Sequence, residues 1–497
     1  MPIVNPLSSG KTLQVGPNKQ FKVPSEAIKV AQAGDTIEID AGEYRGDVVA
    51  WYTAGLHIKG VGGMVVMRAA GQGAQGKAIF VAGGPNSIVE NIEFRDCKVS
   101  AKNGAGIRME QVSGYLYLKN CKFFDNENGV MSANNLGASL IVEDCEFGRN
   151  TDGGTGGQAH NLYLGYSEKL IVRRSFFYGA KYGSNLKSRA KESLVEHCYV
   201  MDGAGGQSSY AMDFSNGGKI TLRGNLMHKG ANSPNDCSVA CGTEGQKWVE
   251  NSLTMTNNTL VSHRNLSNFV RVQPWFDSAT LTANVFASTR GTADGLIYPG
   301  GFPEANVKQD KNLRTTNAAF FGADNIAEPN FWPNAEGQKL ISIPALPDAT
   351  YTTDAPAPFV LRKAATTSPR IGALQSSPRE AGEIVTPPQA DLGPVTPPKP
   401  VEPVDPPKPV EPPKPVEPPV VTPPVVVPPK PTEPAQPVLT GTNAVISDAA
   451  NALLKGIMGV TALQGVSLGS ASATYDLSLP DGKKKVITVS LSVQDAP

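Results

Sequence analysis

Four residues near the middle of the chain carry side chains that could act together on a charged polymer: Tyr163, Lys187, Arg189 and Asp213. Each of them alternates with apolar or small neighbours that are expected to face inward, which predicts that they point outward from short strands. Lys187 and Arg189 could hold a carboxylate, and an arginine does so with two parallel hydrogen bonds. Neutralising a uronate carboxylate acidifies the adjacent C–H bond, so that Tyr163 or Lys187 could remove its proton in a β-elimination.

The same alternation extends this outward face over neighbouring strands. It predicts one column formed by Arg108, Met131, Tyr163, Lys187, Asp213 and, beyond a looped coil, Arg271. Adjacent strands of a sheet lie about 4.8 Å apart, so consecutive members of the column could contact one sugar unit. His160, next to a turn, is expected as a partner of the base. The residues expected to contact substrate are Arg108, Glu110, His160, Asn161, Asn216 and Arg271.

Two alternatives use these residues differently. A glycoside hydrolase needs two carboxyl groups about 5 to 9.5 Å apart, which Asp213 could form with Glu110 or Asp202. Glu110 is several strands away from Asp213, and Asp202 falls in a predicted loop. In a purely structural alternative, Lys187 and Asp213 form an exposed ion pair worth less than about 1 kcal/mol, and His160 bonds the backbone of its own turn.

The strands that position these residues belong to a repeat between Val81 and Arg290. An apolar residue is followed three positions later by a small or polar residue, and two positions after that by a second apolar residue. The pattern returns every 23 to 33 residues, a period typical of solenoids. The leading apolar positions are Val89, Leu118, Val142, Val172, Val195, Leu222, Met255 and Leu281. Because no amphipathic helical run accompanies the pattern, it predicts the coils of a parallel β-solenoid.

The small or polar position of the repeat is expected to point into the solenoid. Its members include three cysteines and then three asparagines: Cys121, Cys145, Cys198, Asn225, Asn258 and Asn284. Stacked thiols and amides are interior packing, and the amides are expected to bond one another along the axis. The six cysteines therefore predict no disulfide framework. Cys237 and Cys241 lack a nearby second pair of His or Cys ligands, so packing is preferred to a metal site.

Composition divides the chain into three parts. Residues 1–380 are predicted to form the solenoid, with a capping helix at residues 24–31 and a closing strand at residues 370–374. Residues 381–438 repeat proline with lysine and glutamate, which predicts an extended polyproline II linker of about 3.1 Å per residue. Residues 439–497 predict a small α+β module, with a helix around residues 446–457 and a hairpin that contains Tyr475 and Ile487.

The composition also limits the partners. The chain has 45 basic and 45 acidic residues, and this net charge of zero argues against nucleic acid or an anionic membrane as the main partner. No apolar run is long enough to span a membrane, and the first residues lack the features of a classical signal peptide. No cofactor is expected. Calcium stays an alternative, although the oxygen ligands of residues 125–129 do not have the spacing of a calcium loop.

The C-terminal module, at residues 439–497, is too short to bury a large core by itself. We expect it to complete its core against a protein partner or against its own copies, for example in a homotrimer. This would make the module an anchor or an oligomerisation element at the end of the proline-rich linker.

The opening phrase at residues 31–44 resembles the first coil of right-handed parallel β-helix proteins of the pectate-lyase-like superfamily. Three further phrases resemble a bacterial branch of that superfamily: residues 160–163 (His-Asn-Leu-Tyr), 186–190 (Leu-Lys-Ser-Arg-Ala) and 213–218 (Asp-Phe-Ser-Asn-Gly-Gly). The resemblance covers roughly residues 10–378 and implies an all-β, right-handed parallel β-helix. The superfamily contains lyases, hydrolases, epimerases, phage tailspikes and non-catalytic members, so it leaves the reaction open.

Two functions fit these expectations. The first is a surface-displayed protein that binds an acidic polysaccharide from the end of a stalk and, in the enzymatic case, cleaves it. The second is a non-enzymatic phage virion spike or fibre that adsorbs to host glycans. Many members of the superfamily are secreted, and the missing signal peptide favours assembly in the cytoplasm and release with a particle. The expected location is a virion or an extracellular surface.

Overall fold

The computed structural model separates the chain into two units, Met1–Pro400 and Val401–Pro497, which are described one at a time. Side chains and backbone are described for residues 10–151, 159–203, 206–264, 268–289, 302–321, 332–341 and 370–375. The backbone alone is described for residues 297–298, 351–354, 360–363, 464–469, 472–478 and 484–490.

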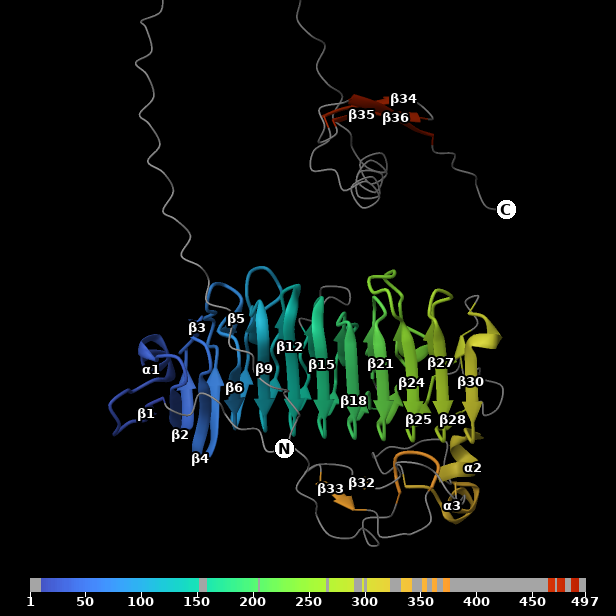
Figure 1. Cartoon of the computed structure of the whole chain (residues 1–497), viewed down its shortest axis with the longest axis horizontal. Coiled ribbons are helices and arrows are strands. Elements are labelled where there is room, and N and C mark those ends of the chain that lie inside the picture. The colour runs from blue at the N-terminus through green and yellow to red at the C-terminus, as the bar shows by residue number, and fades with distance from the viewer. Residues whose placement is uncertain are drawn as a thin grey trace, which may run out of the picture. The chain divides into compact units, whose positions relative to one another are not determined.

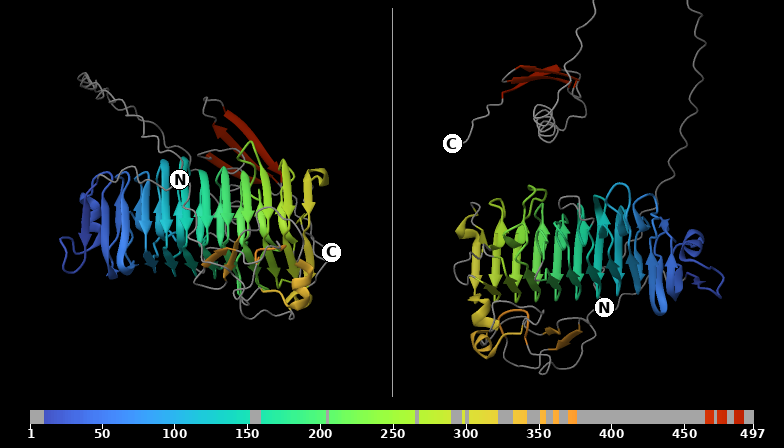
Figure 2. Two further views of the ribbon diagram at one scale, coloured as in Figure 1. Left: turned by 60° about the horizontal axis from the view of Figure 1, so that its bottom comes forward. Right: turned by 180° about the vertical axis from the view of Figure 1, so that it is seen from behind.

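The first unit is a stack of coils in which successive strands pair in parallel on three sides (Figure 1). Figure 2 shows the same stack from two further directions. The first side, called sheet 1 below, has ten strands: β3 (Val49–Trp51), β5 (Ala78–Ala82), β8 (Ala105–Met109), β11 (Asn128–Ser132), β14 (Leu162–Leu164), β17 (Leu186–Ser188), β20 (Met212–Phe214), β23 (Cys237–Cys241), β26 (Asn268–Val272) and β29 (Ile297–Tyr298).

A 21-stranded sheet forms the other two sides. Its first part, sheet 2, contains β1 (Thr12–Val15), β2 (Thr36–Arg45), β4 (His57–Arg68), β6 (Ser87–Glu90), β9 (Ser113–Lys119), β12 (Asn135–Glu143), β15 (Ser167–Arg173), β18 (Glu192–Glu196), β21 (Lys219–Arg223), β24 (Ser252–Thr256), β27 (Ser278–Thr282) and β30 (Val307–Asp310). Its second part, sheet 3, contains β7 (Ile92–Arg95), β10 (Lys122–Phe124), β13 (Glu146–Gly148), β16 (Phe176–Tyr178), β19 (Tyr199–Met201), β22 (Leu226–Lys229), β25 (Thr259–Ser262), β28 (Val285–Ser288) and β31 (Leu313–Thr316). The two parts join because β4 pairs with β6 through its first half and with β7 through its second half.

The remaining elements of the first unit are short. They are α1 (Pro24–Val30), the 3-10 helix η2 (Glu304–Asn306), α2 (Asn317–Phe321), α3 (Ala335–Ile341) and the antiparallel pair β32 (Tyr351–Asp354) and β33 (Val360–Lys363). Helix α1 lies at the first end of the stack, as predicted, and buries Ala27 and Ile28 (Figure 1). A helix in this position covers strand edges that would otherwise be open to pairing with another chain.

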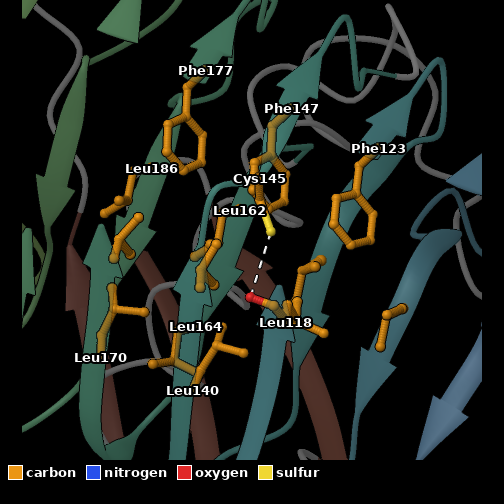
Figure 3. Packing of buried hydrophobic residues seen from close by; sticks show 14 of the residues in the cluster. Leu118, Phe123, Leu140, Cys145, Phe147, Leu162, Leu164, Leu170, Phe177 and Leu186 are labelled. Atoms are coloured by element: carbon orange, nitrogen blue, oxygen red, sulfur yellow. Dashed lines mark hydrogen bonds between the residues drawn. The ribbon is translucent and has the colours of Figure 1, made fainter. Parts of the chain in front are cut away.

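Apolar side chains fill the interior in columns that run along the stack (Figure 3). Phe94, Phe123, Phe147 and Phe177 stack with ring centroids 5.2, 4.6 and 4.7 Å apart. These are members of the second apolar position of the repeat, which therefore points into the solenoid. On sheet 1, Leu162, Leu164 and Leu186 are completely buried, which fixes the direction of the residues between them.

The predicted asparagine ladder is present next to these columns. The amide of Asn225 donates to Oδ1 of Asn258 at 2.9 Å, and the amide of Asn258 donates to Oδ1 of Asn284 at 2.9 Å. Asn312 adds one further step beyond the predicted repeat, at 3.0 Å from Asn284. All six cysteines are free and buried, as expected. Each amide also satisfies backbone groups at a corner where the chain cannot pair as a strand.

We expect Asn258→Ala to lower the free energy of unfolding by about 2 to 5 kcal/mol, because the amide and the backbone N–H of Asn225 both donate to Asn258. Asn258→Cys should cost less than half as much. In the cysteine part of this column a thiol accepts the backbone N–H of Cys121 at 3.4 Å, so sulfur can replace the oxygen acceptor. Urea unfolding of the two variants measures the difference. Equal losses would show that the ladder bonds are not what stabilises these coils.

The predicted closing strand at residues 370–374 is wrong. Among the residues that the structure describes, the last parallel strands of sheets 2 and 3 are β30 and β31, which pair with β27 and β28. Gly372 has a φ of +90°, so the chain turns there and cannot continue as a strand. Its N–H donates to the carbonyl of Ala283, and Ala373 packs in an apolar cluster with Leu226 and Val261 on the outside of sheet 3. The apolar residues of this segment therefore cover a sheet rather than extend one.

The second unit contains an antiparallel sheet of β34 (Gln464–Gly469), β35 (Ser472–Ser478) and β36 (Lys484–Ser490). Tyr475 lies opposite Ile487, which is the predicted hairpin, and β34 adds a strand that was not predicted. The predicted helix at residues 446–457 and the linker at 381–438 lie outside the described residues. Within the described parts of the chain, no helix has both the length and the hydrophobicity needed to cross a membrane.

Candidate functional site

The predicted outward column exists on sheet 1. Met131 lies opposite Tyr163, Tyr163 opposite Lys187, and Lys187 opposite Asp213. Arg108 precedes Met131 in the same register, and Arg271 follows after Ala240 of the looped coil. The alternation with buried leucines therefore assigned the direction of these residues correctly.

The centre of the column is a cluster of two cations and two carboxylates. Lys187 Nζ lies 3.4 Å from Asp213 Oδ2 and also contacts Oε1 of Glu244. The other oxygen of Glu244, Oε2, accepts a hydrogen bond from Arg189 Nη2. Glu244 thus bridges both cations. We call Lys187, Arg189, Asp213 and Glu244 the charge cluster.

Glu244 was not predicted as a site residue. It lies between β23 and β24, on a segment that begins at Gly242, and no strand alternation applies there. Gly242 has a φ of +85°, and a Cβ at this position would come within 2.4 Å of the Trp275 ring. One signal was present in the sequence: the interval from Leu222 to Met255 is the longest of the repeat. A loop inserted into a regular coil is a common place for functional residues.

The two carboxylates of the cluster have different surroundings. Only 4% of the Asp213 side chain is exposed, against 39% of the Glu244 side chain. Burial raises the pKa of Asp213 above its ordinary value, and the Lys187 ammonium opposes this shift. The predicted Lys187–Asp213 ion pair is therefore real but is not exposed, which corrects the purely structural alternative.

Aromatic rings surround the cations. The Tyr163 ring centroid lies 5.9 Å from Lys187 Nζ and 5.6 Å from the guanidinium carbon of Arg189. Tyr166 lies 5.7 Å from the same guanidinium carbon, and Trp248 donates from Nε1 to the carbonyl of Arg189 at 3.2 Å. Tyr163, Tyr166 and Trp248 are all partly exposed. Cations next to partly exposed aromatic rings suit a sugar that carries a charge.

His160 lies beside Tyr163 with ring centroids 5.5 Å apart, but it is buried. Its Nδ1 accepts the backbone N–H of Ser184 in the next coil at 2.9 Å. Burial lowers the pKa of His160 to about 3, and the nearby charge of Lys187 acts in the same direction. His160 is therefore a neutral residue that supports Tyr163 from behind, and its bond reaches the neighbouring turn rather than its own.

The buried His160 makes a testable contribution to acid sensitivity. Because its folded-state pKa is depressed, its stabilising effect is complete above pH 6.5 and is lost as the pH falls towards 3. Between pH 7 and pH 5 this loss amounts to about 2 kcal/mol. In His160→Asn the side-chain oxygen can replace Nδ1 as the acceptor without titrating, so urea unfolding should show a weaker pH dependence. An unchanged pH dependence would exclude His160 as a source of acid sensitivity.

Besides His160, two further residues expected to contact substrate are buried. Asn161 is completely buried, and its amide donates to Oδ1 of Asn185 at 2.8 Å while its Oδ1 accepts from Asn150. It belongs to a second asparagine ladder at the corner before β14. Asn216 is also buried, and its amide donates to the carbonyls of Glu244 and Gly245. It fixes the backbone that carries Glu244 instead of contacting a ligand.

The other predicted residues lie apart from the charge cluster. Arg108 Nε donates to Glu110 at 2.8 Å, and this pair belongs to β8 and its following turn, four strands of sheet 1 before Asp213. At about 4.8 Å per strand, Glu110 is about 19 Å from Asp213, too far for a hydrolytic pair. Asp202 is buried and accepts backbone N–H groups of Ser208 and Gly230. Arg271 lies beyond Ala240 in the column and beside Tyr210.

The oxygen-rich segment 125–129 does not form a calcium loop. Asp125 binds Arg149 through two hydrogen bonds of 2.8 Å, and Glu127 accepts the backbone N–H groups of Val99 and Gly104. Asn128 accepts the N–H of His160. These oxygens stabilise turns of the solenoid. Over the described residues, no group of three or more His, Cys, Asp or Glu side chains is arranged to hold a metal ion.

Comparison with known proteins supports the class of fold. Residues 54–229, about a third of the chain, match a family model described as a right handed beta helix region. The solenoid is therefore a right-handed parallel β-helix, as the resemblance to the pectate-lyase-like superfamily implied.

Among the solved structures that resemble the chain are a pectate lyase and a pectin methylesterase. The pectate lyase Pel9A is 14% identical with a TM-score of 0.43, over 73% of this chain and 96% of that one. A pectin methylesterase variant in complex with a hexasaccharide is 13% identical with a TM-score of 0.26, over 66% and 94%. These similarities assign no activity to the chain. Among curated proteins, none matches it significantly.

Proposed function

We propose that the protein binds an acidic polysaccharide on the outer face of sheet 1 and cleaves it by β-elimination. The observation that carries this proposal is that β14 and β17, two adjacent strands, place Tyr163 beside both Lys187 and Arg189. A uronate needs two things in this reaction: cations at its carboxylate and a base at the neighbouring carbon. Tyr163, Lys187 and Arg189 provide both within one sugar unit.

The residues divide the reaction between them. Arg189 and Lys187 bind the uronate carboxylate and stabilise the negative charge that develops when the C5 proton leaves. Tyr163, acting as a phenolate, accepts that proton, the electron pair forms a C4–C5 double bond, and the bond from C4 to the glycosidic oxygen breaks. The departing oxygen takes a proton from water and becomes a hydroxyl group, and Tyr163 returns its proton to the solvent. Lys187 serves here as a cation rather than as the base, because two carboxylates contact its ammonium.

The test is incubation with a panel of acidic and neutral polysaccharides, with ultraviolet absorbance and reducing ends followed together. We expect unsaturated ends from a polyuronate and none from a neutral glucan. Reducing ends without ultraviolet absorbance would indicate hydrolysis, and binding without any product would support an adsorption fibre. No binding to any acidic polymer would contradict the proposal.

A second candidate, a glycoside hydrolase, is favoured by one observation. Asp213 and Glu244 contact the same Lys187 ammonium, but Asp213 is buried and Glu244 is partly exposed. Burial raises the pKa of Asp213, as a general acid requires, while a more exposed carboxylate suits a nucleophile or base. In this case Asp213 would protonate the leaving oxygen and Glu244 would act as nucleophile or base. Glu244 replaces Glu110 and Asp202 as the partner considered from the sequence. We rank this candidate second because the pair is already neutralised by Lys187 and Arg189.

The C-terminal part of the chain would hold the site away from the surface to which the protein is attached. The proline-rich segment 381–438 would act as a stalk and the C-terminal module, at residues 439–497, as an anchor, either on a protein partner or in a homotrimer. Display on a virion or on an extracellular surface would then bring the outer face of sheet 1 to a glycan layer.

A further inference from the structure

The charge cluster has no spare positive charge for a ligand. Two cations, Lys187 and Arg189, face two carboxylates, Asp213 and Glu244. A uronate that approaches this cluster adds a third carboxylate to two cations. Binding an anion there is favourable only if one resident carboxylate first gives up its contacts, since excess like charge in a partly buried site is costly.

Glu244 can leave the cations more easily than Asp213. Its side chain is 39% exposed, while Lys187 and Arg189 are 11% and 22% exposed, so it covers the cations from the solvent side. Its backbone is held separately: Asn216 donates to the carbonyl of Glu244 at 3.0 Å, and the N–H of Glu244 donates to the carbonyl of Ser215 at 2.8 Å. The carboxylate can therefore rotate into solvent while the loop stays in place.

The contacts of Glu244 are also those that a uronate would make. One of its oxygens contacts the ammonium of Lys187 and the other contacts the guanidinium of Arg189. This is the bridging geometry expected for a bound carboxylate.

We propose that Glu244 is a resident counter-ion that occupies the carboxylate position of the substrate and is displaced by it. This inference rests on the proposed function. Since one carboxylate replaces another, the exchange itself yields little affinity, and net binding must come from the rest of the ligand. Partly exposed Tyr166 and Trp248 are placed to supply it by contact with sugar rings.

Displacement makes the site selective for chains over monomers. A tethered carboxylate competes at an effective concentration of about millimolar or higher, so a free uronate monomer at lower concentration rarely replaces it. An oligosaccharide makes further contacts along the column, and these contacts can offset the free energy needed to displace Glu244. The ligand class is therefore an oligomeric or polymeric uronate rather than a small carboxylic acid.

The test compares Glu244→Gln with the full-length wild type in calorimetric titrations of a hexa-uronate and of the monomer. We expect the variant to bind the hexamer about tenfold more tightly, because a neutral amide competes less well for two cations. Monomer binding should become measurable only in the variant. Glu250→Gln, which removes an exposed ion pair with Lys219 at the end of the same segment, should leave both affinities unchanged.

Other outcomes separate the two proposals. If the wild type binds the hexamer and Glu244→Gln binds it equally or more weakly, the counter-ion inference is overturned while the proposed function stands. If neither protein binds any uronate, both the proposed function and the counter-ion inference are overturned. Glu244→Asp serves as a second variant that keeps the charge, but its shorter side chain cannot bridge both cations. Its affinity for the hexamer should lie between those of the wild type and Glu244→Gln.

Discussion

Lys187→Met should reduce kcat/KM on a polyuronate by about 100- to 1,000-fold. The substitution keeps most of the side-chain volume but removes the ammonium that contacts Asp213 and Glu244. Without it, the substrate carboxylate loses one of its two cations, and the charge that develops during proton removal is stabilised less. The measurement is the initial rate of ultraviolet absorbance over a range of substrate concentrations.

Lys187→Met is also expected to lower the free energy of unfolding, so two control variants are needed. Removing one partner of a buried ion pair costs about 3 to 5 kcal/mol, because Asp213 stays buried without its cation. The double variant Lys187→Met/Asp213→Asn removes this cost and should recover stability without recovering activity. Lys191→Met, which breaks only an exposed pair with Glu168, should behave like the wild type. Full activity in the double variant would exclude Lys187 from the reaction.

Tyr163→Phe is expected to lower kcat by about 100- to 10,000-fold with a much smaller change in KM. The ring and its contacts with Lys187 and Arg189 remain, while the phenolic oxygen, which accepts the proton as a phenolate, is lost. A base acts only in the chemical step, so the loss should appear in kcat. Kinetics of unsaturated-product formation, together with binding of the hexa-uronate, separates these two parameters.

Tyr166→Phe is the matched control for this prediction. Tyr166 lies on the turn between β14 and β15 and is not a member of the column that contains Tyr163, Lys187 and Asp213. We expect at most a few-fold effect. If Tyr163→Phe keeps wild-type kcat, another group removes the proton and the assignment of the base is wrong.

The sequence predicted the parts of this site that depend on strand geometry. Tyr163, Lys187 and Asp213 alternate with leucine, methionine and phenylalanine residues that are completely buried, and alternation of this kind fixes the direction of a side chain. The repeat of the solenoid then fixes which residues are neighbours in adjacent coils. Both rules use only local spacing, which a sequence contains.

Where the chain leaves a strand, these rules no longer apply. Asn161 was expected to contact substrate, but it stands at the corner before β14, where the chain turns and its amide joins a ladder inside. Glu244 could not be placed because its position depends on Asn216, which holds the loop from another coil. At residues 370–374 the apolar pattern was correct, but it packs on the outside of sheet 3 after the turn at Gly372.

A crystal structure of the protein with a bound hexa-uronate tests the central claim most directly. We predict that one uronate carboxylate lies within hydrogen-bond distance of both Lys187 Nζ and the Arg189 guanidinium, next to the Tyr163 hydroxyl. The Glu244 carboxylate should then have rotated away from both cations. Sugar density on another face of the solenoid, with these four side chains arranged as they are without ligand, would contradict the claim.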